Sequence, residues 1–179
     1  MSEPAMRAAV VTVSDRSFRG ERPDGSGPAL KALLEGAGAE VIDATVVPDD
    51  PDVIARTLVR LADERRCELV ITTGGTGLSP RDTTPEATRQ VIDKELFGME
   101  MAIQQDSLMR TPFAMLSRGV AGARGQTLIL NFPGSPKAVR ECFAVVKPVL
   151  GHAVKLLRDE NPYAMHQSPS VTRNKRQVT

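Results

Sequence analysis

Hydrophobic and polar residues follow one another along the chain in blocks, and the blocks predict strands and helices in turn. "MRAAVVTVSD" is a continuous apolar run that ends in polar residues, which is typical of a strand buried on both faces. The runs "EVIDATVVPDD", "CELVITT" and "TLILN" predict further strands. After each of these strands comes a stretch in which apolar residues recur at helical spacing.

The predicted helices carry recognisable start signals. "GPALKALLEGAG" has Pro28 in its first turn and glycines near its end. The next helix starts at Pro51, with Asp50 as its N-cap, and spans residues 51–66. Further helices are predicted for "TTPEATRQVIDKEL" and "GMEMAIQQDSLMR", separated around Gly98, and for residues 136–157. The glycine-rich "FAMLSRGVAGARGQ" is predicted to contain a short strand pair.

Strands that alternate with helices of this length predict an α/β fold, a three-layer sandwich in which helices cover both faces of a mainly parallel sheet. A chain of 179 residues fits one domain. We expect that domain to span residues 1–158. Residues 159–179 are polar and lack a periodic apolar face, so we expect a flexible C-terminal tail there.

Composition narrows the possible partners. Lys and Arg total 23 against 22 acids, a net charge of +1, and aromatic residues make up 3% of the chain, so a nucleic-acid partner is not expected. No apolar run is long enough to cross a bilayer, and the start of the chain lacks the apolar core of a signal peptide. We therefore expect a cytoplasmic protein with no membrane partner. Cys67 and Cys142 lie far apart and predict buried thiols.

Polar residues gather where the predicted strands end. Each strand is followed by such a group: Ser14, Asp15 and Arg16; Asp49 and Asp50; the glycine-rich loop from Thr72; and Asn131, Pro133, Gly134 and Ser135. In an open parallel sheet the carboxyl ends of the strands share one edge, and ligands bind there. The sequence therefore predicts a single site at this edge.

The loop "TTGGTGLSPRDTTPEAT" is the strongest part of the predicted site. It has neither the lysine and spacing of GxxxxGK[ST] nor the continuation of GxGxxG, so both standard nucleotide loops are excluded. Its glycines are a moderate signal for anion binding. Asp82 leaves the same loop, and a carboxylate beside a bound phosphate is best explained by a divalent cation held between them. Asp49 could supply a second oxygen ligand.

Several of these residues also have simpler interpretations. Asp50 is expected to cap the helix that follows it, which leaves Asp49 for a ligand. Thr84 and Ser135 each precede a proline and are candidate helix caps, although a helix start with exposed N–H groups can also bind phosphate. Asp15 and Arg16 could pair with each other at the surface.

Three segments resemble the molybdopterin adenylyltransferase family, which includes the G domain of gephyrin. They are "VVTVSDR", "TTGGTGLSPRDTTPEAT" and "TPFAMLSRGVAGARGQTLILNFPGSPKAVRECF", and the resemblance spans about residues 7–157. Members of this family transfer AMP from Mg-ATP to the terminal phosphate of molybdopterin and release pyrophosphate. The resemblance implies Mg²⁺ as cofactor, ATP and molybdopterin as ligands, a homotrimer, and transient contacts with other proteins of molybdenum cofactor biosynthesis.

The resemblance also implies roles for individual residues. Asp82 and Asp49 match the catalytic, metal-binding acids of the family. The nucleotide and phosphate side is expected to comprise Gly74, Gly75, Thr76, Gly77, Ser14 and Asp15. The substrate side is expected to comprise Ser117, Arg118, Asn131, Pro133, Gly134, Ser135 and Lys137.

Other functions remain open at this stage. One is a molybdopterin-binding relative with weak or no catalysis, and another is a trimeric scaffold that binds a protein partner. A general phosphate-binding regulator would explain the glycine loop but not Asp82 and Asp49 together.

Overall fold

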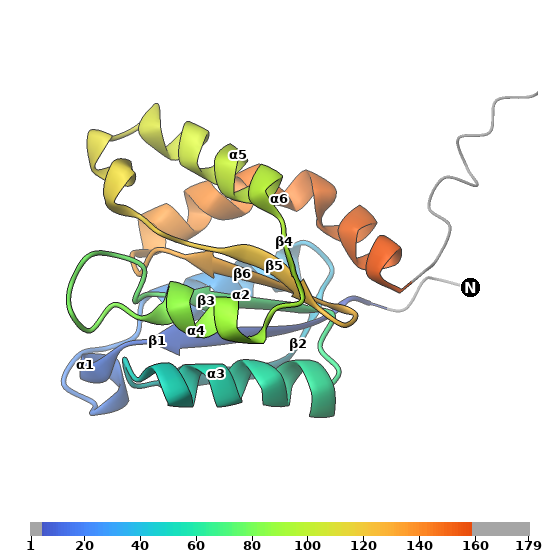
Figure 1. Cartoon of the computed structure of the whole chain (residues 1–179), viewed down its shortest axis with the longest axis horizontal. Coiled ribbons are helices and arrows are strands. Elements are labelled where there is room, and N and C mark those ends of the chain that lie inside the picture. Colours follow the sequence, from blue (N-terminus) through green and yellow to red (C-terminus); the bar gives the residue numbers. More distant parts are fainter. Residues whose placement is uncertain (1–4, 159–179) are drawn as a thin grey trace, which may run out of the picture.

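The computed structural model describes residues 5–158, and within them the strands form a single sheet (Figure 1). The strand order is β2-β1-β3-β6-β5-β4. The strands are β1 (Arg7–Val13), β2 (Glu40–Val47), β3 (Leu69–Thr73), β4 (Lys94–Glu95), β5 (Ala121–Arg124) and β6 (Thr127–Phe132). The first four in this order are parallel, while β5 and β4 pair in antiparallel fashion. The mainly parallel sheet is thus confirmed.

Helices cover both faces of this sheet, as predicted (Figure 1). α2, α5 and α6 pack on one face, and α3 and α4 pack on the other. The helices are α1 (Asp15–Phe18), α2 (Ser26–Gly36), α3 (Pro51–Val59), α4 (Thr84–Val91), α5 (Phe97–Leu108) and α6 (Pro136–Leu157). A π-helical turn, η1 (Arg60–Glu64), extends α3, and a 3₁₀ turn, η2 (Pro112–Leu116), follows α5. The fold is therefore a three-layer α/β sandwich.

β1 shows why its sequence is apolar at five of its seven positions. Ala8 and Val10 point into the core under α2 and α6, whereas Ala9, Val11 and Val13 point into the core under α3 and α4. All five are almost completely buried. The strand has no solvent-exposed face, and an alternating pattern would not suit it.

The connections on either side of β1 form a topological switch point, where folds of this kind have a ligand-binding crevice. α2 links β1 to β2 on one face of the sheet, and α3 links β2 to β3 on the other. The chain leaves β1 toward the face covered by α2 and leaves β3 toward the face covered by α4, so the loops that follow these two strands diverge. Such a switch point at the carboxyl ends of parallel strands is where α/β proteins bind ligands.

The structure corrects the prediction for residues 83–96. The helix predicted for "TTPEATRQVIDKEL" ends at Val91, and Lys94–Glu95 forms the edge strand β4. Ile92 has extended backbone angles, and Asp93 and Leu96 donate backbone hydrogen bonds to β5. The two predicted helices are indeed separate, but the break falls at residues 92–96, and Gly98 lies in the first turn of α5. The short strand pair expected in the glycine-rich segment is represented by β5, which pairs with β6.

Two other predictions concern the C-terminal tail and membrane-spanning helices. The C-terminal tail predicted for residues 159–179 lies outside the described residues. Among residues 5–158, every helix falls short of the combined length and apolar character that a bilayer crossing requires.

Candidate active site

The four predicted loops meet at the carboxyl edge of the sheet. Ser14, after β1, donates its backbone N–H to Val47 at the end of β2 (2.9 Å). Gly74, after β3, donates to Phe132 at the end of β6 (3.0 Å). A Cβ on Gly134 would lie only 3.2 Å from the Cα of Gly74, so these two loops touch through their backbones. The predicted convergence of the loops is confirmed.

The glycine loop requires glycine at its first two positions. Gly74 and Gly75 have φ angles of +102° and +65°, which other residues rarely adopt. A Cβ on Gly74 would lie 2.3 Å from the carbonyl oxygen of Val13, and a Cβ on Gly75 would lie 2.3 Å from Oγ1 of Thr84. Thr84 braces the loop, since its hydroxyl donates to the Gly74 carbonyl (3.0 Å) and its N–H to that of Gly75 (3.1 Å).

Thr84 is consequently not the helix cap that its place before Pro85 suggested. The N-cap of α4 is Thr83, whose side chain makes no capping hydrogen bond. Ser135, by contrast, caps α6 as predicted, because its side chain accepts the N–H of Ala138 (3.1 Å). Asp50 also caps its helix as predicted, accepting the N–H groups of Asp52 and Val53 (both 3.0 Å).

Asp15 and Asp49 hold each other where the neighbouring strands β1 and β2 end. The N–H of Asp15 donates to Oδ2 of Asp49 (2.7 Å), and the N–H of Asp49 donates to Oδ1 of Asp15 (3.0 Å). Asp15 does not pair with Arg16, as one interpretation of the sequence had it, but with Arg81, whose Nε lies 3.0 Å from Oδ2 of Asp15. Asp49 is thus held in a defined orientation.

Asp49 and Asp82 both lie against the glycine loop. Oδ1 of Asp49 would be 3.3 Å from a Cβ on Gly75, and Oδ2 of Asp82 would be 2.8 Å from a Cβ on Gly77. Burial raises the pKa of Asp49, and the negative charges of Asp15 and Asp82 raise it further, while the hydrogen bond from Asp15 lowers it. The charge of Asp82 therefore acts on Asp49, although the two acids follow different strands.

The donor set fits a magnesium ion that is shared with phosphate oxygens. Within residues 5–158 no three His, Cys, Asp or Glu side chains form a closed metal site. Asp49 and Asp82 each use only Oδ2 in the hydrogen bonds of this region, with Ser79 as the donor to Asp82 (2.9 Å). Magnesium in proteins commonly takes one or two carboxylates and completes its shell with substrate phosphates and water. Next to Asp82 in the sequence, the buried hydroxyl of Thr83 has no hydrogen-bond partner among the described residues.

Arg118 braces the glycine loop. Its backbone N–H donates to Thr76 (2.9 Å), its Nε donates to the Gly77 carbonyl (2.8 Å), and its Nη2 donates to the Asp82 carbonyl (2.7 Å). Its Nη1 also pairs with Glu86. The guanidinium predicted to bind substrate is therefore occupied in fixing the loop.

Asn131 is likewise turned toward the protein interior. Its amide donates to the hydroxyls of Thr72 (3.0 Å) and Thr88 (2.9 Å), and its Oδ1 accepts the N–H of Val120 (3.2 Å).

Ser117 and Pro133 line a small cavity of about 20 Å³ beside Asn131. Lys137 is exposed, and its Nζ lies 3.9 Å from Oε1 of Glu141. Of the predicted substrate side, Gly134, Ser135 and Lys137 are the solvent-exposed members.

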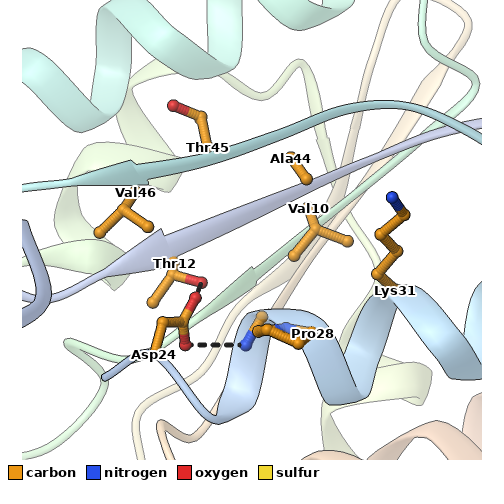
Figure 2. Close-up of a pocket in the computed structure, with 9 residues that line it drawn as sticks. Val10, Thr12, Asp24, Pro28, Lys31, Ala44, Thr45 and Val46 are labelled. Atoms are coloured by element: carbon orange, nitrogen blue, oxygen red, sulfur yellow. Dashed lines mark hydrogen bonds between the residues drawn. The ribbon is translucent and has the colours of Figure 1, made fainter.

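A larger hollow of about 350 Å³ lies elsewhere, between α2 and the pair β1 and β2 (Figure 2). Asp24, which the sequence analysis did not single out, accepts the hydroxyl of Thr12 (2.6 Å) and the N–H groups of Ser26 and Gly27 (both 3.0 Å). These contacts fix the start of α2, as the dashed lines in Figure 2 indicate for Thr12 and the helix start. None of the predicted site residues lines this hollow, so we place the candidate site at the glycine loop.

The sequence analysis also missed Arg81 and Glu86. Arg81 stands directly before Asp82 in "PRD", and this position beside an acidic site was a usable signal. Glu86 lies in the first turn of α4 and gave no signal, because acids are common there for helix-dipole reasons alone.

The fold and the site define a class of α/β protein with a glycine-rich loop and paired acids at a switch point. Residues 9–152 match the family described as "Probable molybdopterin binding domain". The chain belongs to this family.

Individual relatives agree with this assignment. The chain is 41% identical over 150 residues to the molybdopterin adenylyltransferase of Helicobacter pylori, covering 83% of this chain and 85% of that protein. It is 45% identical over 153 residues to the molybdenum cofactor synthesis protein cinnamon of Drosophila melanogaster, which covers 84% of this chain but only 25% of cinnamon. The crystal structure of the molybdopterin biosynthesis enzyme MoaB from Thermus thermophilus is similar in fold, with a TM-score of 0.81, 49% identity, and coverage of 86% of this chain and 97% of that chain.

Proposed function

We propose that this protein is a molybdopterin adenylyltransferase that moves AMP from Mg-ATP onto the terminal phosphate of molybdopterin and releases pyrophosphate. The observation that carries this proposal is the position of Asp49 and Asp82, whose carboxylates both lie against the glycine loop although the two residues follow different strands. The similarity to named molybdopterin adenylyltransferases over most of the chain supports it.

The reaction asks the protein to position phosphates and to balance charge. A phosphate oxygen of molybdopterin, already ionised at neutral pH, attacks the α-phosphorus of ATP. The bond from that phosphorus to the bridging oxygen breaks, and its electron pair leaves with pyrophosphate. Magnesium, when bound, offsets the negative charge of the phosphates. No histidine or cysteine nucleophile is required, because the substrate supplies the nucleophile.

Each part of the crevice has a task in this proposal. Asp49 and Asp82 hold the metal, with Asp15 and Ser79 fixing their orientation. The backbone of residues 74–77 binds the phosphates, and glycines at positions 74, 75 and 77 let this loop pack tightly against Val13, Thr84 and Asp82. Ser14 lies at the nucleotide side, and Ser117, Pro133, Gly134, Ser135 and Lys137 form the pterin side. Arg118 and Asn131 act by holding the loop and the end of β6 in place.

We further propose that the protein acts as a homotrimer in the cytoplasm and meets other proteins of the pathway transiently. α5 has no buried residue. Together with η2 it exposes large apolar side chains, namely Phe97, Met101, Leu108, Met109, Phe113, Met115 and Leu116. An apolar surface of this extent is typical of an interface between subunits.

The proposal is tested by incubating the purified protein with molybdopterin, ATP and Mg²⁺. We expect adenylylated pterin and an equal amount of pyrophosphate, both dependent on the protein. Pterin binding without product would indicate a binding-only relative, and the absence of both would favour a scaffold.

A further inference from the structure

Arg81 is bound to the acidic network of the crevice from its rim. Its Nε donates to Oδ2 of Asp15 and its Nη2 donates to Oδ1 of Asp15, both at a distance of 3.0 Å. The two residues are 66 positions apart in sequence, and their contact joins the glycine loop to the turn after β1. Oδ1 of Asp15 also accepts the N–H of Asp49, so Arg81 reaches Asp49 through one shared carboxylate.

Stability alone does not explain this contact. The side chain of Arg81 is 60% exposed and that of Asp15 is 21% exposed. Ion pairs that are open to solvent contribute about 0–1 kcal/mol to folding, so this pair can open at little cost. A contact that is cheap to break is suited to exchange with a stronger ligand.

The negative charges at this site would repel a bound polyphosphate, so the site needs a cationic side chain that can bind it. Asp15, Asp49 and Asp82 bring three carboxylates to the place where the proposed function requires a triphosphate. Arg118 is already held by two carbonyl oxygens and Glu86. Among the basic residues described at this edge, Arg81 is the one whose guanidinium is bonded to the acids themselves.

We propose that Arg81 exchanges partners during the reaction. Its guanidinium leaves Asp15, binds the β- and γ-phosphates of ATP, and then holds the departing pyrophosphate. The inference rests on the proposed function and adds to it the residue that receives the leaving group. A guanidinium forms bidentate hydrogen bonds with phosphate as readily as with carboxylate. Its place at the rim fits a leaving group that moves away from the half-buried acids. Asp15 then keeps its bond to the N–H of Asp49, and the acid pair stays oriented.

In this exchange Asp15 and the polyphosphate compete for the guanidinium of Arg81. Substitutions of Arg81 and of Asp15 should therefore change the affinity for polyphosphate in opposite directions. Binding of Mg-tripolyphosphate is measured by calorimetry, without molybdopterin. Arg81→Gln should weaken binding about tenfold or more, as the loss of a charge-assisted hydrogen bond implies. Asp15→Asn should strengthen it, because asparagine can still accept the N–H of Asp49 but no longer retains the guanidinium.

Matched controls separate this from general electrostatics. Arg89→Gln removes a similarly exposed arginine, paired with Glu95 on the far side of α4, and should leave the affinity within about twofold. Asp50→Asn removes one negative charge at the same edge while asparagine still caps α3, so the gain with Asp15→Asn should exceed the gain with Asp50→Asn. The affinity for AMP, which lacks the outer phosphates, should not change in Arg81→Gln.

Three results would overturn the inference: equal tripolyphosphate affinity in Arg81→Gln and parent, a loss of affinity in Asp15→Asn, or no binding of tripolyphosphate by the parent. A purely structural Arg81–Asp15 pair would give losses of the same sign in both variants. The adenylyl-transfer assay decides the proposed function separately. A parent that forms adenylylated pterin, together with an Arg81→Gln variant that binds tripolyphosphate normally, would reject the inference and leave the function standing.

Discussion

Gly75 leaves no room for a side chain beside Asp49, since a Cβ at this position would lie 3.3 Å from Oδ1 of the carboxylate. The same Cβ would lie 2.3 Å from the hydroxyl of Thr84, and the φ angle of +65° is unfavourable for any other residue. The conformation of the loop and the orientation of the proposed metal-binding acid therefore depend on the same glycine.

Gly75→Ala should disturb both stability and activity. We expect a loss of more than about 1 kcal/mol in the free energy of unfolding, from the strained φ and the contact with Thr84, and a clear loss of adenylyl transfer. Gly151→Ala is the matched control, because Gly151 lies inside α6 with nothing within 4 Å of the added Cβ. It should gain about 0.5–1 kcal/mol and keep full activity. Urea unfolding and the product assay measure both, and a harmless Gly75→Ala would contradict this view of the loop.

The adjacent acids Asp49 and Asp50 should separate catalysis from stability. Asp49→Ala is expected to lower the rate far more than the affinity for pterin and to shift the dependence on Mg²⁺. Asp50→Ala removes the cap of α3 and should cost about 1 kcal/mol of stability with little change in rate. Steady-state kinetics over a Mg²⁺ titration make the comparison. Identical titrations for Asp49→Ala and the parent would show that Asp49 does not act through the metal.

Cys142 should make stability fall at high pH. Burial raises its pKa from the ordinary value of 9.0 to about 11. The thiol contributes its full stabilisation below pH 9.0, and this is lost as the pH rises toward 11, because the unfolded chain ionises first. The difference in unfolding free energy between the parent and Cys142→Ala should therefore shrink between about pH 8 and about pH 10.5. A difference that does not change with pH would mean that the thiol is accessible to water.

Much of the fold could be predicted from the sequence because the local residue pattern of each segment agrees with its surroundings in the folded protein. β1 is mostly apolar because both of its faces are covered, and Asp50 and Ser135 cap helices because their side chains suit that position. β4 could not be predicted, since Lys94 and Glu95 have no apolar pattern and form a strand only because β5 offers an edge.

The site was predictable in outline but not in its internal contacts. Polar residues after parallel strands had to meet at one edge, and they do. Which side chain faces which is a matter of distant contacts, such as that of Arg81 with Asp15 or of Arg118 with Gly77. Asn131 illustrates the limit, since a polar residue at a strand end gives the same signal whether it faces a ligand or three buried groups of the protein.

The exposed surface of α5 and η2 is the expected interface of the proposed trimer. Met109 is 88% exposed, and we expect Met109→Glu to shift the protein toward a monomer, measured by light scattering. Phe18→Glu is the control, because Phe18 is 57% exposed but lies on α1. A parent protein that is monomeric would contradict the proposed trimer, and dissociation by Phe18→Glu alone would place the interface elsewhere.

Each subunit of that trimer should carry a complete site, because the proposed site residues all belong to one sheet edge and its loops. Mixed trimers of parent and Asp82→Ala chains should show activity in proportion to the parent fraction. A steeper loss would mean that neighbouring subunits share their sites.

The most direct test of the account is the rate of adenylyl transfer by Asp82→Ala, measured with ATP labelled at the α-phosphate in a single turnover. Asp82 lies on the partly exposed loop, so its loss should leave the far-UV circular dichroism and the melting temperature close to those of the parent. We predict that label reaches molybdopterin in the parent and that the rate falls by about a hundredfold or more in the variant. Transfer within a few-fold of the parent rate by a folded Asp82→Ala protein would contradict the assignment of this crevice as the active site.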